Sequence, residues 1–531
     1  MRTAHSHSPD TPAPDTPAPR HATATLAVTA AATTLALMNY TAPMLTLPAT
    51  AEAFGTPSSA QAWLLNGTPL GLAALLLVAG ALADAHGRRR VFLLGTLALG
   101  VTTALGAFAD TTALFTAARI AQGVASAAIL AGSLGLLADA YPSGRDRIRA
   151  TGVWGASVSA GIALGPLLAA VLSLADWRLA YLALGAATLA TAAAGARTLT
   201  PPPPERGAGG PGPSATGRAD GAAPAATGRA DGPGPTATGR TDGPGPSATG
   251  RADGPGPSAT GRTTGDAGPT PSPAGRAGGG GRPDLAGATT LALALGALLT
   301  ALTLGRDGWL RPVVGVLLLA SAVLLALFVA VERRRKDPMI DLGLLRRPAF
   351  RASTVGALFT GLAVIGLFSV LPSLLMRGQG VAPLAAAGLF VLWSGTSFVV
   401  ALQARRLAGR ISAPYQLALG FVLSAVGVLP LLGTVDAPAV PWPRLMAGLV
   451  VAGAGSGLLN AALPRLAVDS VPPERAAMGS GANNTARYIG SAAGVALMLA
   501  LSATDPDTAF AASAVLALAG AALTVAGSPR R

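Results

Sequence analysis

The sequence predicts an all-α integral membrane protein, and three observations support this prediction. Hydrophobic residues make up 51% of the 531 residues and charged residues only 12%, with a mean hydropathy of +0.51. The apolar residues lie in runs of roughly 18 to 25, the length that a helix needs to cross about 30 Å of hydrocarbon. Arginines cluster between the runs, mainly in alternate segments. A soluble domain of this size would carry many more charged residues.

The apolar runs predict fourteen membrane-spanning helices. Six come before a long polar segment, at residues 22–47, 61–83, 91–109, 112–139, 149–173 and 178–198. Eight come after it, at residues 284–304, 312–332, 350–376, 383–404, 413–433, 445–464, 480–502 and 508–527. The first run is too long and uninterrupted for the apolar stretch of a cleaved signal peptide, so we expect a retained helix.

Basic residues predict the orientation in the membrane, because short cytoplasmic loops carry an excess of them. One set of loops contains Arg88, Arg89, Arg90, Arg145, Arg147, Arg149, Arg333, Arg334, Arg335, Lys336, Arg346, Arg347, Arg351, Arg405, Arg406 and Arg410. The alternate loops contain no arginine cluster, only the isolated residues Arg178, Arg306, Arg311, Arg377 and Arg444, or no arginine at all. We therefore predict a multi-pass protein of the cell (plasma) membrane with both termini in the cytoplasm. This pattern also accounts for the net charge of +14 without a nucleic-acid partner.

The predicted spans divide the chain into six parts. These are a disordered cytoplasmic tail (1–21), a six-helix bundle (22–198), a disordered Pro/Gly-rich cytoplasmic linker (199–283), two extra helices (284–332), a second six-helix bundle (333–527) and a cytoplasmic C-terminus (528–531). In the linker, Ala-Thr-Gly-Arg recurs every eleven residues. The Gly and Pro content excludes a coiled coil, which leaves an expanded linker or a binding role for its arginines.

A charged motif follows the second predicted helix, and it contains Gly80, Asp84, Gly87, Arg88 and Arg89. A carboxylate at a helix C-terminus needs compensating partners, and the glycines permit a tight turn. The motif resembles the loop signature of the major facilitator superfamily, although Ala85 stands where the family usually has a basic residue. The resemblance implies two six-helix bundles, here with two extra central helices, latched together by this loop. The alternative is that the arginines only orient the protein.

Arg119 lies several residues inside an apolar run, where a charge costs at least about 2.5–3.5 kcal/mol at the membrane centre. Arg119, Gln122 and Gly123 resemble the second motif of the superfamily, R-x-x-q-G, whose arginine is implicated in proton coupling or substrate handling. We therefore regard Arg119, Gln122 and Gly123 as candidates for coupling. The alternative is that Arg119 extends to the outer membrane surface.

The fifth predicted helix carries Gly152, then Gly161 after eight residues, and the pair Gly165 and Pro166 after three more. Small residues let helix backbones approach closely, and proline weakens or kinks a helix. The spacing resembles the antiporter motif of the drug-exporting branches, which marks exporters rather than importers. Glycine is also frequent in such helices by chance.

Two further segments, 337–350 and 479–487, resemble the fourteen-helix drug:proton antiporter branch. One residue departs from that branch: Asn39 stands where the first helix usually has an aspartate. An amide cannot carry a proton, although it can form hydrogen bonds. The proton coupling that the resemblance implies would then need Asp84, Asp139 or Glu52, or a cargo that carries the proton itself.

The substrate is expected in a central cavity. Candidate contacts are Asn39, Tyr40, Asn66, Trp154, Trp393, Gln403 and Asn460, each of which could instead serve helix packing. A cavity so poor in acids favours neutral, weakly acidic or amphipathic organic molecules over dications.

The sequence lacks the residues of a catalytic site. It has no cysteine and only four histidines, three of them in the first 21 residues, and no P-loop. We predict no enzyme, cofactor or metal site, but a monomeric efflux transporter of drugs or antibiotic-like metabolites that works by alternating access. Its partners would be a small organic molecule, a proton as coupling ion and the lipid bilayer. The alternatives are a small-solute importer or uniporter, and a transporter-like sensor that moves nothing.

Overall fold

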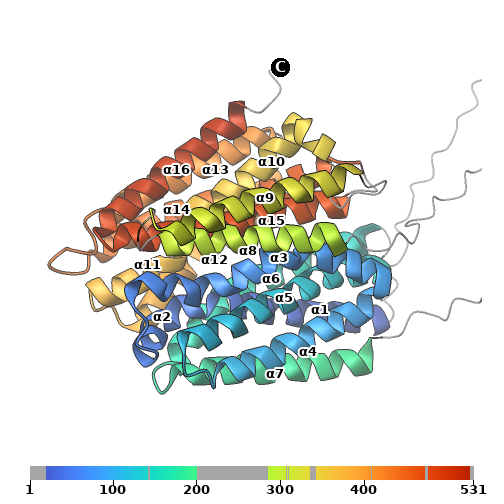
Figure 1. Ribbon diagram of the computed structural model, residues 1–531, viewed down its shortest axis with the longest axis horizontal. Coiled ribbons are helices and arrows are strands. Elements are labelled where there is room, and N and C mark those ends of the chain that lie inside the picture. The colour runs from blue at the N-terminus through green and yellow to red at the C-terminus, as the bar shows by residue number, and fades with distance from the viewer. Residues whose placement is uncertain are drawn as a thin grey trace, which may run out of the picture. The chain divides into compact units, whose positions relative to one another are not determined.

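The computed structural model describes residues 20–141, 144–199, 285–305, 308, 310–334, 342–407, 410–472 and 476–526. All of them belong to one compact unit, formed by residues 1–201 and 278–531. Within these ranges the elements are helices and no strand occurs (Figure 1). The predicted all-α class is confirmed. Nearly all of the predicted tail and linker lies outside the described residues.

Helices occupy each of the predicted spans. Before the linker these are α1 (Arg20–Thr41), α2 (Pro43–Ala53), α3 (Gln61–His86), α4 (Arg88–Gly106), α5 (Thr112–Ala140), α6 (Gly144–Leu172) and α7 (Trp177–Thr198). After it come α8 (Leu285–Leu304), α9 (Pro312–Arg334), α10 (Pro348–Phe359), α11 (Gly366–Gly378), α12 (Pro383–Leu407), α13 (Ala413–Val428), α14 (Trp442–Asp469), α15 (Ala476–Ser502) and α16 (Pro506–Ala526). Short 3-10 turns occur at Ser58–Ala60, Leu342–Arg346 and Leu429–Leu431.

Eleven membrane spans in the described part of the chain are long and apolar enough to cross a bilayer. They fall on eleven of the fourteen predicted ranges, and α3, α4 and α8 occupy the other three. The multi-pass nature of the protein is therefore confirmed. Fourteen membrane crossings stay a prediction.

Two of the long helical segments are interrupted near their middle. The first changes from α1 to α2 at Pro43, and a π-helical turn, Thr360–Ile365, separates α10 from α11. Proline has no N–H, so it cannot bond the carbonyl four residues before it. Single π-helical turns within α-helices are frequent at functional sites. Both interruptions line the cavity described below.

Glycines bring the helices around these interruptions into close contact. A Cβ atom built on Gly123 of α5 would lie 2.9 Å from Cα of Gly71 in α3. In the second half, a Cβ atom on Gly366 of α11 would lie 2.7 Å from Cα of Gly494 in α15. A larger side chain does not fit at such distances, so glycine is needed for these two helix contacts.

Helices that come before the linker pack against helices that come after it. The contacts are those of α3 with α15, α6 with α12 and α2 with α11. The two predicted extra helices are adjacent, and α8 also contacts α3 and α15 (Figure 1). Among the described residues, three side-chain hydrogen bonds join the two halves. They join Tyr40 Oη to Ser491 Oγ at 2.9 Å, Asn66 Nδ2 to the carbonyl of Ala492 at 3.0 Å and Arg377 Nη1 to Gln61 Oε1 at 2.9 Å.

Candidate functional site

A cavity lies between the two halves, with an empty volume of about 610 Å³ that includes space open to solvent. Its walls come from α1, α2, α6, the π-helical turn, α11, α12, α14 and α15. The lining residues are Leu37, Tyr40, Thr41, Met44, Val158, Ile162, Thr360, Ile365, Phe368, Ser369, Phe390, Trp393, Ser456, Asn460, Arg487 and Tyr488. No aspartate or glutamate is among these described residues. The cavity therefore carries one cation, several neutral polar groups and a large apolar surface.

Three of the predicted substrate contacts line the cavity: Tyr40, Trp393 and Asn460. The others do not. Asn66 bonds the α15 backbone, and Gln403 is an exposed residue of α12. Trp154 Nε1 donates to Ser133 Oγ at 3.0 Å, between α6 and α5. Asn39 belongs instead to a buried polar network beside the cavity.

The buried network is centred on Arg119 of α5, whose side chain is 0% exposed. Its Nη1 atom donates to the carbonyl of Asn39 at 2.8 Å, to Asn39 Oδ1 at 2.7 Å and to Gln122 Oε1 at 2.7 Å. Asn39 Nδ2 in turn donates to Thr103 Oγ1 at 2.7 Å, and Gln122 Nε2 to the carbonyl of Thr102 at 3.0 Å. This geometry excludes the alternative in which the Arg119 side chain extends to the membrane surface.

The sequence around Asn39 explains why α1 can accept these bonds. The carbonyl of Asn39 would normally bond the N–H of the residue four positions later, which is Pro43 and has none. Arg119 supplies the missing donor. Arg119 makes no ion pair with a described carboxylate, and its Nε has no described partner. All its described acceptors are neutral.

A second arginine, Arg487 of α15, lines the cavity itself. Its Nη2 donates to Asn484 Oδ1 at 2.9 Å, and its guanidinium carbon lies 5.5 Å from the ring centroid of Tyr488. Sequence reasoning placed Arg487 in a family-like segment but gave it no role. Its position, twelfth of the 27 residues of α15, was the signal that could have identified it.

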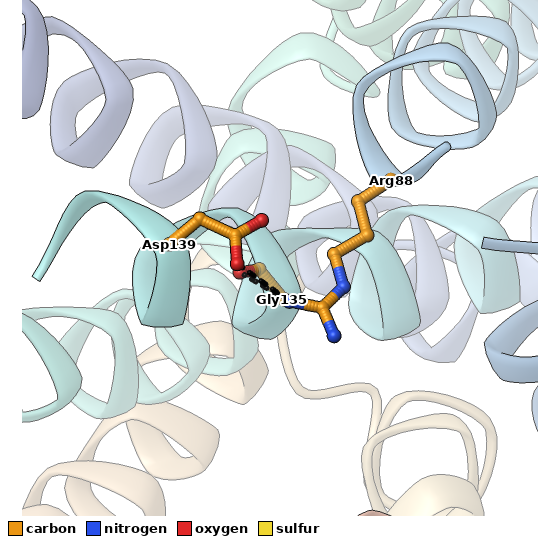
Figure 2. A network of polar contacts seen from close by, with 3 residues as sticks. All are labelled: Arg88, Gly135 and Asp139. Carbon is orange, nitrogen blue, oxygen red and sulfur yellow. Dashed lines mark hydrogen bonds and ion pairs between the residues drawn. The ribbon is translucent and has the colours of Figure 1, made fainter. Parts of the chain in front are cut away.

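The charged motif between α3 and α4 makes contacts within the first half. Arg88 Nη1 pairs with Asp139 Oδ1 at 2.7 Å and donates to the carbonyl of Gly135 at 3.3 Å, both in α5 (Figure 2). Arg89 bonds the carbonyls of Ala196 and Leu199 at the end of α7. Gly87 has a φ of 94°, which favours glycine.

Two further residues of the charged motif, Gly80 and Asp84, do not test the predicted latch. Gly80 lies in α3 with nothing within 4 Å of a Cβ atom built on it. The side chain of Asp84 lies outside the described residues. A latch between the two halves therefore stays a prediction.

The glycines of the predicted antiporter motif lie where α6 meets α1. A Cβ atom on Gly161 would lie 2.7 Å from Leu37 Cβ, and one on Gly165 would lie 2.6 Å from the Met38 carbonyl oxygen. Gly152, in the same helix, is half-buried. The motif thus holds α6 against the part of α1 that carries the Arg119 network.

We expect Gly165→Ala to lower stability by about 1–3 kcal/mol, because the added methyl group would collide with the α1 backbone. Gly155→Ala is the matched control, since a Cβ atom on Gly155 meets nothing within 4 Å. That substitution should be neutral or slightly stabilising. Thermal unfolding of the purified variants measures both effects. Equal midpoints for the two variants would contradict the close packing of α1 and α6.

Acids in the described helices lie at the helix ends. Asp139 is the penultimate residue of α5, and Glu52 is exposed near the end of α2. Glu332 was not among the predicted site residues, yet it is only 2% exposed and lies two residues before the end of α9. Its burial in the last turn of an apolar helix could not be read from the sequence.

The sequence and the fold agree with one known family. The profile described as Major Facilitator Superfamily matches residues 29–244 and 285–495. The chain belongs to the Major Facilitator Superfamily. Among solved structures of low sequence identity, a bacterial homolog of the human lysosomal transporter Spinster is similar, with a TM-score of 0.60 and 14% identity over 96% of this chain and 97% of that one. The human organic anion transporter MFSD10 (TETRAN) has a TM-score of 0.53 and 18% identity over 95% of this chain and 100% of its own.

Relatives of this superfamily chain include drug and antibiotic resistance proteins. Multidrug resistance protein Stp of Mycobacterium tuberculosis is 26% identical over 85% of this chain and 70% of its own length. Puromycin resistance protein pur8 of Streptomyces alboniger is 28% identical over 89% and 80% of the two chains. A probable actinorhodin transporter of Streptomyces coelicolor is 27% identical over 94% and 77%. The resemblance to drug-exporting branches of the superfamily is confirmed.

Proposed function

We propose that this protein exports drugs or antibiotic-like metabolites across the cell membrane by alternating access. The single observation that supports this most is the cavity at the contact between the two halves, which is lined mainly by apolar and aromatic side chains. The glycine contact between α6 and α1 and the similarity to resistance proteins favour export over import.

The residues of α1 bear on the driving force of transport. The resemblance implies proton coupling, yet the position in α1 that usually carries a proton is Asn39, bonded to Arg119. The described acids lie at helix ends, away from the cavity lining. We therefore propose that α1 carries no proton during transport. Export is instead driven by the electrochemical gradient of the cargo.

Efflux from cells tests the export proposal. We expect expression of the protein to lower the accumulation of several members of a chemically varied antibiotic panel and to raise the concentrations that inhibit growth. Cells with the empty vector are one control. Cells that produce Gly165→Leu are the other, because this side chain would separate α6 from α1. Unchanged accumulation of every compound, with the protein present in the membrane, would refute the proposal.

A further inference from the structure

The central cavity is electropositive, and we propose that it selects organic anions with an apolar, aromatic body, whose acidic group binds Arg487. This inference rests on the proposed export function and specifies its cargo. Four features of the described residues support it: the depth of Arg487, the unpaired donors of the cavity wall, a second buried cation and the aromatic surface that α11 and α12 contribute.

Arg487 is too deep in its helix to be a surface residue. It is the twelfth residue of α15, about 16 Å along the helix from its first residue. A guanidinium at such depth needs a counter-charge or several acceptors. The described partners of Arg487 are one amide oxygen, on Asn484, and the ring of Tyr488, and both are uncharged. The positive charge is thus left for an anion to compensate.

Two buried donors in the cavity wall lack a hydrogen-bond partner among the described residues. They are Arg487 Nε and Trp393 Nε1. Both groups can only donate, so the partner they lack is an acceptor. A carboxylate, a sulfonate or a phenolate supplies acceptor oxygens together with negative charge. A water molecule or a neutral ligand could satisfy one donor but would leave the charge of Arg487 uncompensated.

A second buried cation strengthens the same preference. Arg119 Nη2 donates to the carbonyl of Tyr40 at 3.4 Å, and Tyr40 and Arg487 both line the cavity. Neither arginine forms an ion pair with a described carboxylate. A cationic cargo would therefore have to lose its water shell beside two positive charges. This free-energy cost disfavours the binding of cations in the cavity.

The remaining surface suits the apolar part of such a molecule. The rings of Phe368 and Trp393 are stacked at 4.6 Å with an interplanar angle of 15°, and Phe390 lies 5.3 Å from Trp393. These side chains come from α11 and α12, whereas Arg487 comes from α15. An amphipathic anion can therefore contact the aromatic surface with its body and Arg487 with its acid.

Two xanthene dyes with similar rings and opposite charges test the proposal: fluorescein, an anion at neutral pH, and rhodamine 123, a cation. Export from cells and from proteoliposomes is measured for the wild type, Arg487→Gln and Arg487→Lys. Arg465→Gln is the matched control, because Arg465 of α14 contacts Gln416 and does not line the cavity. Membrane content and thermal unfolding establish that each variant is folded.

We expect the wild type to export fluorescein in preference to rhodamine 123. Arg487→Gln should lower fluorescein export about tenfold or more, whereas Arg465→Gln should not. Arg487→Lys should keep the preference for the anion at a reduced rate, and it decides the matter if Arg487→Gln does not fold.

The anion proposal is overturned, with export intact, if the wild type prefers rhodamine 123. The same holds if it exports antibiotics but neither dye, or if folded Arg487→Gln exports fluorescein at the wild-type rate. If neither dye nor any antibiotic moves, the export function itself is wrong.

Discussion

Asn39→Leu should destabilise the protein by about 3 kcal/mol and abolish export. The substitution removes the amide oxygen 2.7 Å from Arg119 Nη1, and a hydrogen bond to a buried charge contributes about 1.5–3 kcal/mol. It also leaves the Arg119 guanidinium, which has no ion-pair partner among the described residues, with one acceptor fewer inside an apolar bundle. Thermal unfolding of the purified variant, together with antibiotic efflux from cells, measures both effects.

A double-mutant cycle shows whether the loss comes from the charge. Arg119→Met added to Asn39→Leu removes the unsatisfied guanidinium, so the double variant should regain part of the lost stability although not export. Thr103→Val is the control for the other end of the network. It deprives only Asn39 Nδ2 of its neutral acceptor and should cost about 1 kcal/mol. If Asn39→Leu unfolds at the wild-type midpoint, Arg119 does not depend on the amide and this account of the network is wrong.

The helices could be predicted from the sequence because hydrocarbon thickness imposes a minimum length of apolar residues. Each predicted span contains a helix, and some ends agree to the residue, as at Thr112, the first residue of α5, which follows the N-cap residue Thr111. The interruption at Pro43 could have been located from the missing N–H. The π-helical turn at Thr360–Ile365 could not, because it depends on close packing with α15 rather than on a local residue preference.

The site was predicted less completely, for a physical reason. Arg119 was identified because a charge within an apolar run is costly wherever the helix lies. Whether a tyrosine, tryptophan or asparagine faces the cavity depends on helix rotation, and composition this rich in Ala, Gly and Leu gives each helix little amphipathic pattern. Tyr40 and Trp154 therefore looked equivalent in the sequence, yet only Tyr40 lines the cavity.

Asn39→Asp should convert the protein into a transporter that depends on the proton gradient. The carboxylate has the shape of the amide it replaces, so one oxygen can accept from Arg119 Nη1 and the other can accept from the Thr103 hydroxyl. The variant should fold, because the new charge pairs with Arg119, which forms no ion pair with a described carboxylate. It adds a group beside the cavity that can bind and release a proton during the transport cycle.

The wild type should respond to voltage instead. An anionic cargo leaving a cell with a negative interior gains about 2.3 kcal/mol per charge for each 100 mV, which corresponds to about a 50-fold concentration ratio. In proteoliposomes that export fluorescein, nigericin removes the pH gradient, and valinomycin with equal potassium on both sides removes the voltage. Valinomycin should stop concentrative export by the wild type, whereas nigericin should not. In Asn39→Asp nigericin should become inhibitory. Nigericin-sensitive export by the wild type would show that a proton site exists elsewhere in the protein, with the buried Glu332 as the first residue to substitute.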